Sequence, residues 1–319
     1  MRITVLAGGI GAARFLRGLL AHLAQAHPGA EVTVIGNTGD DITLFGLHVS
    51  PDLDTVMYTL GGGIHPEQGW GRAEETRAVQ DELGAYSEPP DWFALGDKDI
   101  ATHLVRTRML REGASLSAAT EALCARWRPG VRLLPMSDDP VTTLVEIAAP
   151  DGTPRTVHFQ EYWVRLHAEP AALKIRFEGA DAARPAPGVL AAIAGADVIV
   201  FPPSNPVVSI GAILAVPGLR AAVAGAAAPV VGLSPIIGGA PVRGMADKVL
   251  AAIGVETSAA AVALHYGPDL LDGWLVDSAD RDAVDAVSAA GIRARAVPLR
   301  MTDVAVTAAM AAAALELVQ

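Results

Sequence analysis

Short apolar runs alternate with longer helical segments along most of the chain. The strand-like runs, rich in Val, Ile and Leu, occupy residues 3–7, 32–36, 198–202 and 230–233. Segments with helical spacing or a high alanine content occupy residues 12–25, 210–224, 245–253 and 303–318. Because the strand-like runs are apolar without alternation, the pattern predicts βα units on a parallel sheet that is buried on both faces. We therefore expect an α/β, Rossmann-like, doubly wound fold.

Two segments depart from this βα pattern. Residues 64–130 contain several helical stretches, and we expect them to form a helical excursion that covers the carboxyl edge of the sheet. Residues 141–178 contain strand-like runs on both sides of Asp151 and Gly152, a dipeptide typical of hairpin turns, which predicts a β-hairpin insertion. No repeat or long linker divides the chain, so we expect a single domain over residues 1–319.

Acidic residues outnumber basic ones in the 319-residue chain, with 35 Asp and Glu against 24 Lys and Arg and a net charge of −11. A nucleic-acid partner would be expected to meet a basic stripe, so nucleic acid is not an expected ligand. The same acidity means that an anionic ligand has to be neutralised locally, by backbone amides, a few placed cationic side chains and a bound metal ion.

The single cysteine, Cys124, excludes an intrachain disulfide, and its apolar helical context predicts a position in the core. The sequence begins directly in a strand-like run, without the features of a signal peptide. No apolar run reaches the roughly 20 residues of a membrane-spanning helix. We therefore expect a cytoplasmic location and no membrane partner.

Three glycines, Gly8, Gly9 and Gly11, follow the first strand-like run and open the first helical segment. Glycine allows close approach to the backbone, and the free N–H groups of a helix start favour anions, so this turn is predicted to bind phosphate. Arg14 stands where the dinucleotide fingerprint has a third small residue, and the Walker ending is absent, so a nicotinamide site is disfavoured. A purely structural turn is the alternative.

Four aspartates follow the second strand-like run within fifteen residues, namely Asp40, Asp41, Asp52 and Asp54. Each of them alone could cap a helix, because the surrounding sequence is typical of turns and helix starts. Their number, and their position close behind the predicted phosphate turn, favour a site for a divalent cation. Mg²⁺ is the cofactor that we expect.

The remaining charged candidates give a weaker signal. A further acidic motif contains a lysine between two aspartates, at Asp97, Lys98 and Asp99. Helix capping explains these residues as well as a functional role does. Four histidines share no metal-ligand spacing and are therefore interpreted as solvated or core residues. They are His48, His103, His158 and His265.

Polar groups also follow two strand-like runs in the second half of the chain. Ser204, Asn205 and Ser209 come after the run at 198–202, and a segment with Gly238 comes after the next run. Because parallel strands end at one edge of a sheet, these loops are predicted to line one ligand crevice, although two unrelated turns remain an alternative.

Several short motifs, spread over nearly the whole chain, occur together in one family. They are the segments 8–12, 37–41, 51–60, 69–71, 95–99, 203–206 and 234–238. In this combination the sequence resembles the phospholactate transferase (CofD) family of coenzyme F420 biosynthesis, and it is most similar to the actinobacterial branch of that family.

The resemblance implies transfer of a phosphorylated three-carbon acid from a guanosine diphospho donor to the ribityl hydroxyl of the deazaflavin Fo, with release of GMP. For the actinobacterial branch it implies an enolpyruvyl donor, which gives dehydro-F420-0, and for the archaeal branch a lactyl donor, which gives F420-0. No residue of this sequence decides between the two acids. The resemblance further implies a homodimer whose other partners are small molecules, among them GDP.

The resemblance also implies that Asp54 lies at the deazaflavin site, where we expect Lys98 as well. We predict that Asp54 or Asp52 orients or deprotonates the attacking hydroxyl. The side chains predicted to hold Mg²⁺ are Asp40, Asp41, Asp52 and Asp54. The residues predicted to hold the nucleotide are Gly8, Gly9, Gly11, Ser204, Asn205, Ser209 and Gly238.

A rival interpretation belongs to a different functional class. The same superfamily includes non-catalytic regulators that bind nucleotide-sugars, and these proteins resemble Asp-Asp-Gly-Gly-Ser-Ser at the double aspartate. Here Asp40 and Asp41 are followed by the apolar segment 42–45, and the motif at 51–55 is present. Both features favour the transferase.

Overall fold

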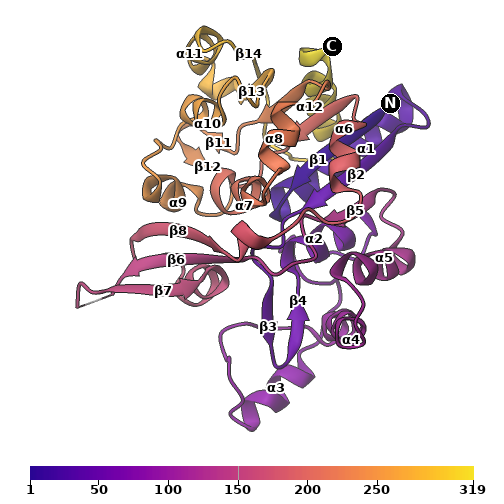
Figure 1. Cartoon of the computed structure of the whole chain (residues 1–319), viewed down its shortest axis with the longest axis vertical. Helices are drawn as coiled ribbons and strands as arrows, with labels where there is room; N and C mark the ends of the chain where they lie inside the picture. The colour runs from indigo at the N-terminus through magenta and orange to yellow at the C-terminus, as the bar shows by residue number, and fades with distance from the viewer. Residues whose placement is uncertain (150) are drawn as a thin grey trace.

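A seven-stranded parallel sheet forms the centre of the computed structural model, which describes residues 1–149 and 151–319 (Figure 1). All six neighbouring strand pairs of this sheet are parallel. In spatial order the strands are β14 (Arg293–Val297), β13 (Gly273–Asp277), β10 (Val230–Leu233), β9 (Val198–Phe201), β1 (Arg2–Ala7), β2 (Glu31–Gly36) and β5 (Arg132–Pro135). The predicted doubly wound α/β fold is therefore confirmed.

Successive side chains of a strand point to opposite faces of the sheet. Apolar side chains therefore emerge on both faces, and helices cover both. Val5 of β1 and Val34 of β2 pack into one core, whereas the next residues, Leu6 and Ile35, pack into the other. The first core is covered by α1 (Gly9–Ala26), α2 (Pro51–Leu60), α5 (Leu116–Trp127) and α12 (Val304–Val318). The second is covered by α6 (Val189–Ala194), α8 (Leu219–Ala224), α9 (Ala246–Ala252), α10 (Ala259–Tyr266) and α11 (Ala283–Ala289).

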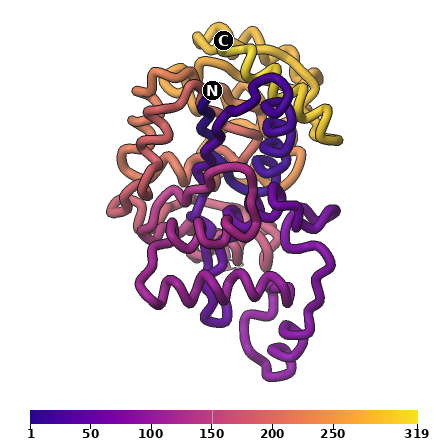
Figure 2. The backbone as a smooth tube through the Cα atoms, turned by 90° about the vertical axis from the view of Figure 1, so that its right-hand side faces the viewer, coloured from indigo at the N-terminus to yellow at the C-terminus, as the bar shows by residue number. Residues whose placement is uncertain are grey.

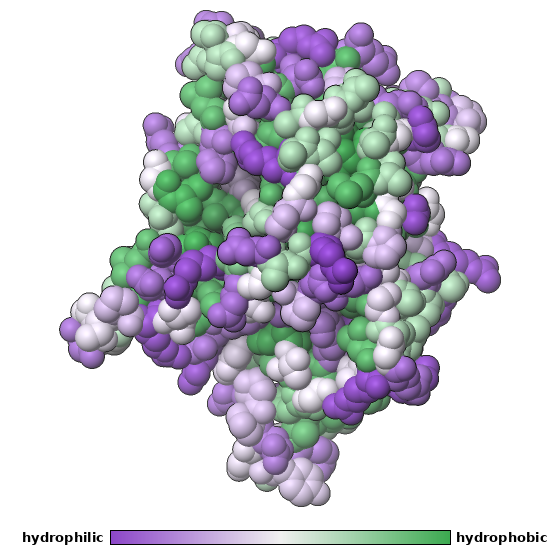
Figure 3. Space-filling model, viewed as in Figure 1, coloured by the Kyte–Doolittle hydropathy of each residue, from purple (hydrophilic) through white to green (hydrophobic). Residues whose placement is uncertain are grey.

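The two ends of the chain meet on the first face. Figure 2 shows α1, in indigo, beside α12, in yellow, and the two helices pack extensively. A β-carbon on Gly18 of α1 would lie 2.5 Å from Thr307 Cβ of α12, so glycine is what permits this close approach. Within the described residues, none of the helices combines the length and the apolar composition needed to cross a membrane. The face in Figure 3 carries hydrophilic and hydrophobic residues side by side.

The remaining elements surround the carboxyl end of the sheet. They are the helices α3 (Ala78–Ala85), α4 (Asp97–Arg111) and α7 (Ala212–Ala215), the hairpins β3 (Ile42–Leu44) with β4 (Leu47–Val49) and β11 (Ile236–Ile237) with β12 (Ala240–Pro241), and a second sheet of β7 (Pro154–His158), β6 (Thr142–Ala148) and β8 (Ala172–Glu178). This second sheet is antiparallel and projects to the side in Figure 1. It lies in the segment expected to form a hairpin insertion, while α3, α4 and α5 lie in the expected helical cover.

One predicted helix is wrong. Residues 210–224 do not form a continuous helix but a π-helical turn at Pro206–Gly211, then α7, then α8. The break follows from Pro217, which lacks an N–H group, and from Gly218, whose φ of 88° is left-handed. Three further strands, β5, β13 and β14, were not predicted, because their short sequences have too weak an apolar signal next to arginine, glycine or proline.

The winding of the sheet reverses between β1 and β9. The chain proceeds from β1 to β2 and β5 on one side, and from β9 to β10, β13 and β14 on the other. The loops that follow β1 and β9 therefore leave neighbouring strands in opposite directions. In open α/β sheets such a switch point is where ligands bind, outside the carboxyl ends of the strands.

Candidate functional site

The glycine-rich turn lies at this switch point and is tied to the loop that follows β9. Gly8 precedes the first residue of α1, and its N–H donates to Ser204 Oγ at 3.3 Å. The Ser204 hydroxyl in turn donates to the Gly8 carbonyl at 2.9 Å. The structure thus brings together two loops, 196 residues apart, that the sequence predicted to share a crevice.

Close packing explains two of the three glycines. A β-carbon on Gly11 would lie 2.3 Å from the Pro203 carbonyl oxygen, and one on Gly8 would lie 2.5 Å from Ser209 Cβ. Both approaches are shorter than real β-carbons allow, so these positions require glycine whether or not a ligand is present. Gly9 is different, because its φ is +70° and the nearest atom to a β-carbon there would be Asp52 Oδ1 at 3.7 Å. The open side of the turn is therefore at Gly9, facing Asp52.

Asp52 is held against the turn by Asn37. Asn37 Nδ2 donates to Asp52 Oδ2 at 2.9 Å, while Asn37 Oδ1 accepts from the N–H of Gly39 at 2.8 Å. Asp52 and Asp40 are both buried. Burial, with the charge of Asp41 as a further cause, raises the pKa of Asp52 to about 6. Burial and then the charge of Asp52 raise the pKa of Asp40 well above its usual value.

Asp41 completes this acidic cluster of Asp40, Asp41 and Asp52. Its Oδ2 accepts from Ser50 Oγ at 2.8 Å and lies 2.9 Å from His48 Nε2. Within the described residues, Asp41 Oδ1 and Asp40 Oδ1 are buried without a hydrogen-bond partner. Buried carboxylate oxygens that repel one another and lack donors are costly. Oxygen ligands of this kind are what a hard divalent cation prefers, so the acidic cluster fits the expected Mg²⁺.

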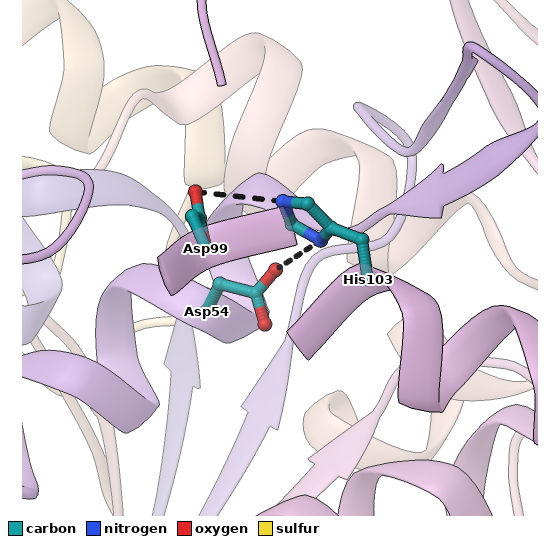
Figure 4. Close-up of side chains that lie close together, drawn as sticks. All are labelled: Asp54, Asp99 and His103. Atoms are coloured by element: carbon teal, nitrogen blue, oxygen red, sulfur yellow. Dashed lines mark ion pairs between the residues drawn. The ribbon is translucent and has the colours of Figure 1, made fainter. Parts of the chain in front are cut away.

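Asp54 lies in a different environment, shown in Figure 4. Arg106 of α4 donates to both of its carboxylate oxygens, with Nη1 3.0 Å from Oδ2. His103 Nδ1 lies 3.7 Å from Asp54 Oδ2, and His103 Nε2 lies 3.4 Å from Asp99 Oδ2. Tyr58 donates its hydroxyl to Asp99 Oδ1 at 2.5 Å. We call these five residues the α2–α4 network.

His103 lies between Arg106 and Asp99. Arg106 Nη1 lies 3.3 Å from His103 Nδ1, and a guanidinium nitrogen can only donate a hydrogen bond, so Nδ1 accepts in this contact. The other ring nitrogen, Nε2, faces Asp99 Oδ2 at 3.4 Å. His103 therefore links the guanidinium of Arg106 to the carboxylate of Asp99.

The four aspartates predicted to hold one metal ion therefore separate into two environments. Asp52 and Asp54 are two residues apart on α2, and an α-helix turns by 3.6 residues, so their side chains leave on different sides. Among the described residues, the group of three acidic or histidine ligands within mutual reach is Asp54, Asp99 and His103. Arg106 already supplies a positive charge next to Asp54, whereas among the described residues the acidic cluster is not a group of three ligands within mutual reach. The metal site therefore stays a prediction.

Helix capping explains part of the 97–99 motif, but the helix that Asp97 caps is α3 and not α4, which contains the motif. Asp97 accepts from the N–H groups of Ala78 and Val79, so it caps α3. The second and third N–H groups of α4, those of Lys98 and Asp99, instead donate to Glu75, each at 2.9 Å. Glu75, in the segment before α3, therefore caps α4, while Asp97 of α4 caps α3.

Lys98 and Gly238 have protein partners of their own. Lys98 Nζ donates to the Ala73 carbonyl at 3.3 Å and lies 3.8 Å from Glu74. The N–H of Gly238 donates to Asp280. Asn205 Oδ1 accepts from Val207 N–H, so it starts the π-helical turn. The roles of Lys98, Gly238 and Asn205 in ligand binding stay predictions.

The sequence interpretation missed three site residues, His48, His103 and Arg106. Two of them have a signal that a helix makes readable. Asp99, His103 and Arg106 are spaced i, i+4 and i+7, which places them on one face of α4. His48 has no such signal, because the hairpin of β3 and β4 brings it to Asp41.

A doubly wound sheet with a glycine turn and a buried acidic cluster at its switch point defines a class of α/β proteins for phosphate-bearing ligands. Residues 3–312 match the family described as 2-phospho-L-lactate transferase CofD, and the chain belongs to this family. As a member of it, the protein is a transferase.

Named relatives agree with the family. A phosphoenolpyruvate transferase of Kitasatospora aureofaciens is 71% identical and is covered over 98% of its length by the whole chain. A phosphoenolpyruvate transferase of Streptomyces coelicolor is 67% identical with the same coverage. A crystal structure of a UPF0052 family member from Bacillus halodurans has a TM-score of 0.62 and 18% identity, and the match covers 98% of this chain and 99% of that one. The latter shows the fold alone.

Proposed function

We propose that the protein transfers a phosphoenolpyruvyl group from a guanosine diphospho donor to the deazaflavin Fo, giving dehydro-F420-0 and GMP. The observation that carries this proposal is a pair of buried oxygens on Asp40 and Asp41, next to Asp52 and the glycine turn, that have no hydrogen-bond partner among the described residues. A diphosphate at this turn would meet carboxylates, so a cation has to lie between them. The name of the relatives, phosphoenolpyruvate transferase, supports the enolpyruvyl group rather than the lactyl one.

The chain's own residues divide the work of binding. The N–H groups at the start of α1 and the hydroxyl of Ser209 bind and orient the diphosphate at the switch point. Asp40, Asp41 and Asp52 would hold a divalent cation, which would neutralise the negative charge that develops on the phosphoryl oxygens. The amide group of Asn37 keeps Asp52 aimed at the turn.

The α2–α4 network positions the acceptor. Asp54 is nearly completely buried, and both of its oxygens accept hydrogen bonds from Arg106. We propose that Asp54 orients the Fo hydroxyl through its remaining lone pairs. Lys98 would lie at the rim of the same site. His103 and Asp99 hold Arg106 and Tyr58 in place, so the carboxylate of Asp54 keeps one orientation.

The proposal is tested by incubating the protein with Fo, Mg²⁺ and either the enolpyruvyl or the lactyl guanosine donor. Product mass and GMP are then measured together. We expect dehydro-F420-0 and GMP in equal amounts from the enolpyruvyl donor, and much slower reaction with the lactyl donor. GMP release without a deazaflavin product, or no reaction with either donor, would contradict the proposal. The expected homodimer is checked by light scattering on the purified protein.

A further inference from the structure

Two arginines converge beside the first turn of α1 without an acidic partner. A β-carbon on Gly69 would lie 2.9 Å from Ile10 Cγ2, 3.5 Å from Arg243 Nη1 and 3.6 Å from Arg14 Nη2. The two guanidinium groups therefore approach one point from different elements, since Arg14 belongs to α1 and Arg243 follows β12. In the part of the chain that the structure describes, neither forms an ion pair with a carboxylate.

The two like charges repel one another, although solvent screens part of this repulsion because Arg243 is exposed and Arg14 is only partly buried. The protein has a net charge of −11, so carboxylates are abundant, yet among the described residues none pairs with either arginine. Burial, and then the charge of Arg14, lower the pKa of Arg243. Two like charges that face one gap are typical of a site for an anion.

The backbone holds this gap open. Arg243 donates through Nη2 to the Gln68 carbonyl, which fixes its side chain beside Gly69. Gly69 has a φ of +73°, a conformation that side chains rarely adopt, so the space between the guanidinium groups stays unfilled. A pocket of about 550 Å³, lined by Arg14 and Gly69 among others, lies on the Arg14 side of this gap. On the other side Arg243 is exposed, so a ligand can reach the gap from solvent.

The position of the gap indicates which anion it receives. Ile10 lies between Gly9 and Gly11, so the gap is beside the turn that is proposed to hold the diphosphate, and Arg14 is one helical turn further along α1. In an enolpyruvyl or lactyl phosphate ester, the carboxylate is attached to the carbon that carries the ester oxygen. It must therefore lie close to the phosphorus.

We propose that Arg14 and Arg243 form a subsite that binds the carboxylate of the donor's three-carbon acid. This inference rests on the proposed function and names the part of the substrate that the two arginines recognise. The planar guanidinium fork matches a carboxylate in geometry as well as in charge. Because both acids carry this carboxylate, the subsite distinguishes an acid-bearing donor from GDP, and not the enolpyruvyl donor from the lactyl one.

The experiment compares Arg14→Gln and Arg243→Gln with a matched control, Arg295→Gln, which removes the same charge from the edge strand β14. Binding of the guanosine diphospho-enolpyruvyl donor and of GDP is measured by calorimetry without Fo, so that the result does not require turnover. We expect each of the two site variants to weaken donor binding at least tenfold, the scale of a lost ionic hydrogen bond, and to change GDP binding less than threefold. The control is expected to change neither.

A second arm uses a guanosine diphospho-propyl ester, which has three carbons but no carboxylate. Wild-type protein is expected to prefer the acid-bearing donor, and both site variants to lose that preference, while Arg243→Lys retains part of it. Equal losses of GDP and donor binding would show that the arginines bind phosphate instead, and unchanged donor binding would also overturn the inference. If wild-type protein binds the donor with the expected preference but transfers nothing to Fo, the proposed function fails and the subsite stands.

Discussion

Arg106 of α4 donates to both carboxylate oxygens of Asp54 on α2, and each side chain is almost completely buried. The pair connects the helical segment that follows residue 64 to the helix that carries Asp52. A buried ion pair of this kind is costly to break, because removing one partner leaves the other charge without compensation. It also separates Asp54, which is paired with a cationic side chain, from Asp40, Asp41 and Asp52, for which we predict a bound cation.

Asp54→Asn is expected to reduce both turnover and stability. The amide keeps the size of the side chain but leaves the guanidinium of Arg106 unpaired, so the free energy of unfolding should fall by about 3–5 kcal/mol. Turnover should fall at least about a hundredfold if Asp54 orients the attacking hydroxyl. Urea unfolding and steady-state kinetics measure the two effects separately.

A double variant separates the two causes. In Asp54→Asn with Arg106→Met the unpaired charge is removed, so part of the stability should return while turnover stays low. A double variant no more stable than Asp54→Asn alone would contradict the explanation by charge burial. A double variant with normal turnover would remove Asp54 from the mechanism.

Asp40→Asn should stabilise the metal-free protein and abolish its response to Mg²⁺. The substitution removes a carboxyl whose pKa is raised by burial and by the charges of Asp52 and Asp41, so the thermal midpoint without metal should rise. Wild-type protein should gain stability as Mg²⁺ is added, whereas the variant should gain little. Differential scanning fluorimetry with a Mg²⁺ titration checks both, and Asp181→Asn, at an exposed position, is the control. Equal Mg²⁺ responses in the variant and the wild type would remove Asp40 from the cation site.

The stability of the metal-free protein should fall as the pH rises from about 4 to 6. Burial raises the pKa of Asp52 from 3.8 to about 6, so over this interval the folded state binds the proton more tightly than the unfolded state does. The stabilising contribution is complete below 3.8 and is lost near 6, at a slope of at most about 1.4 kcal/mol per pH unit for this group. Chemical unfolding at a series of pH values measures it.

Metal should reverse this trend, because a cation binds the ionised carboxylates. With saturating Mg²⁺, stability should rise over the same interval instead of falling. Asp52→Asn should flatten the slope in both conditions. A slope that persists unchanged in this variant would assign the titration to another group.

Gly11→Ala should destabilise the fold independently of any ligand. The added β-carbon would lie 2.3 Å from the Pro203 carbonyl oxygen, which is backbone and cannot rotate away. We expect a loss of at least about 1 kcal/mol, the lower range of overpacking. The control is Gly84→Ala in α3, where the added carbon meets nothing within 4 Å and helix propensity favours alanine by up to about 1 kcal/mol. Thermal unfolding that ranks the two variants in the opposite order would contradict this packing argument.

The sequence by itself determined the class of the fold. Continuous apolar runs such as those of β1 and β2 can be stable only when both faces are buried, which requires a parallel sheet between helices. It also determined the position of the glycine turn, because local spacing specifies where a strand ends and a helix begins. The π-helical turn and the break near Pro217 escaped prediction, since the apolar pattern continues through them.

The grouping of the site residues was decided only by the tertiary structure. Asp52 and Asp54 are neighbours in sequence, but the orientation of α2 directs one to the glycine turn and the other to Arg106, 52 residues away. Packing contacts likewise pair Gly11 with Pro203, and Arg14 with Arg243 across Gly69. Charge pairing and close approach depend on distances in space, and a one-dimensional pattern specifies those distances only within a single helix or strand.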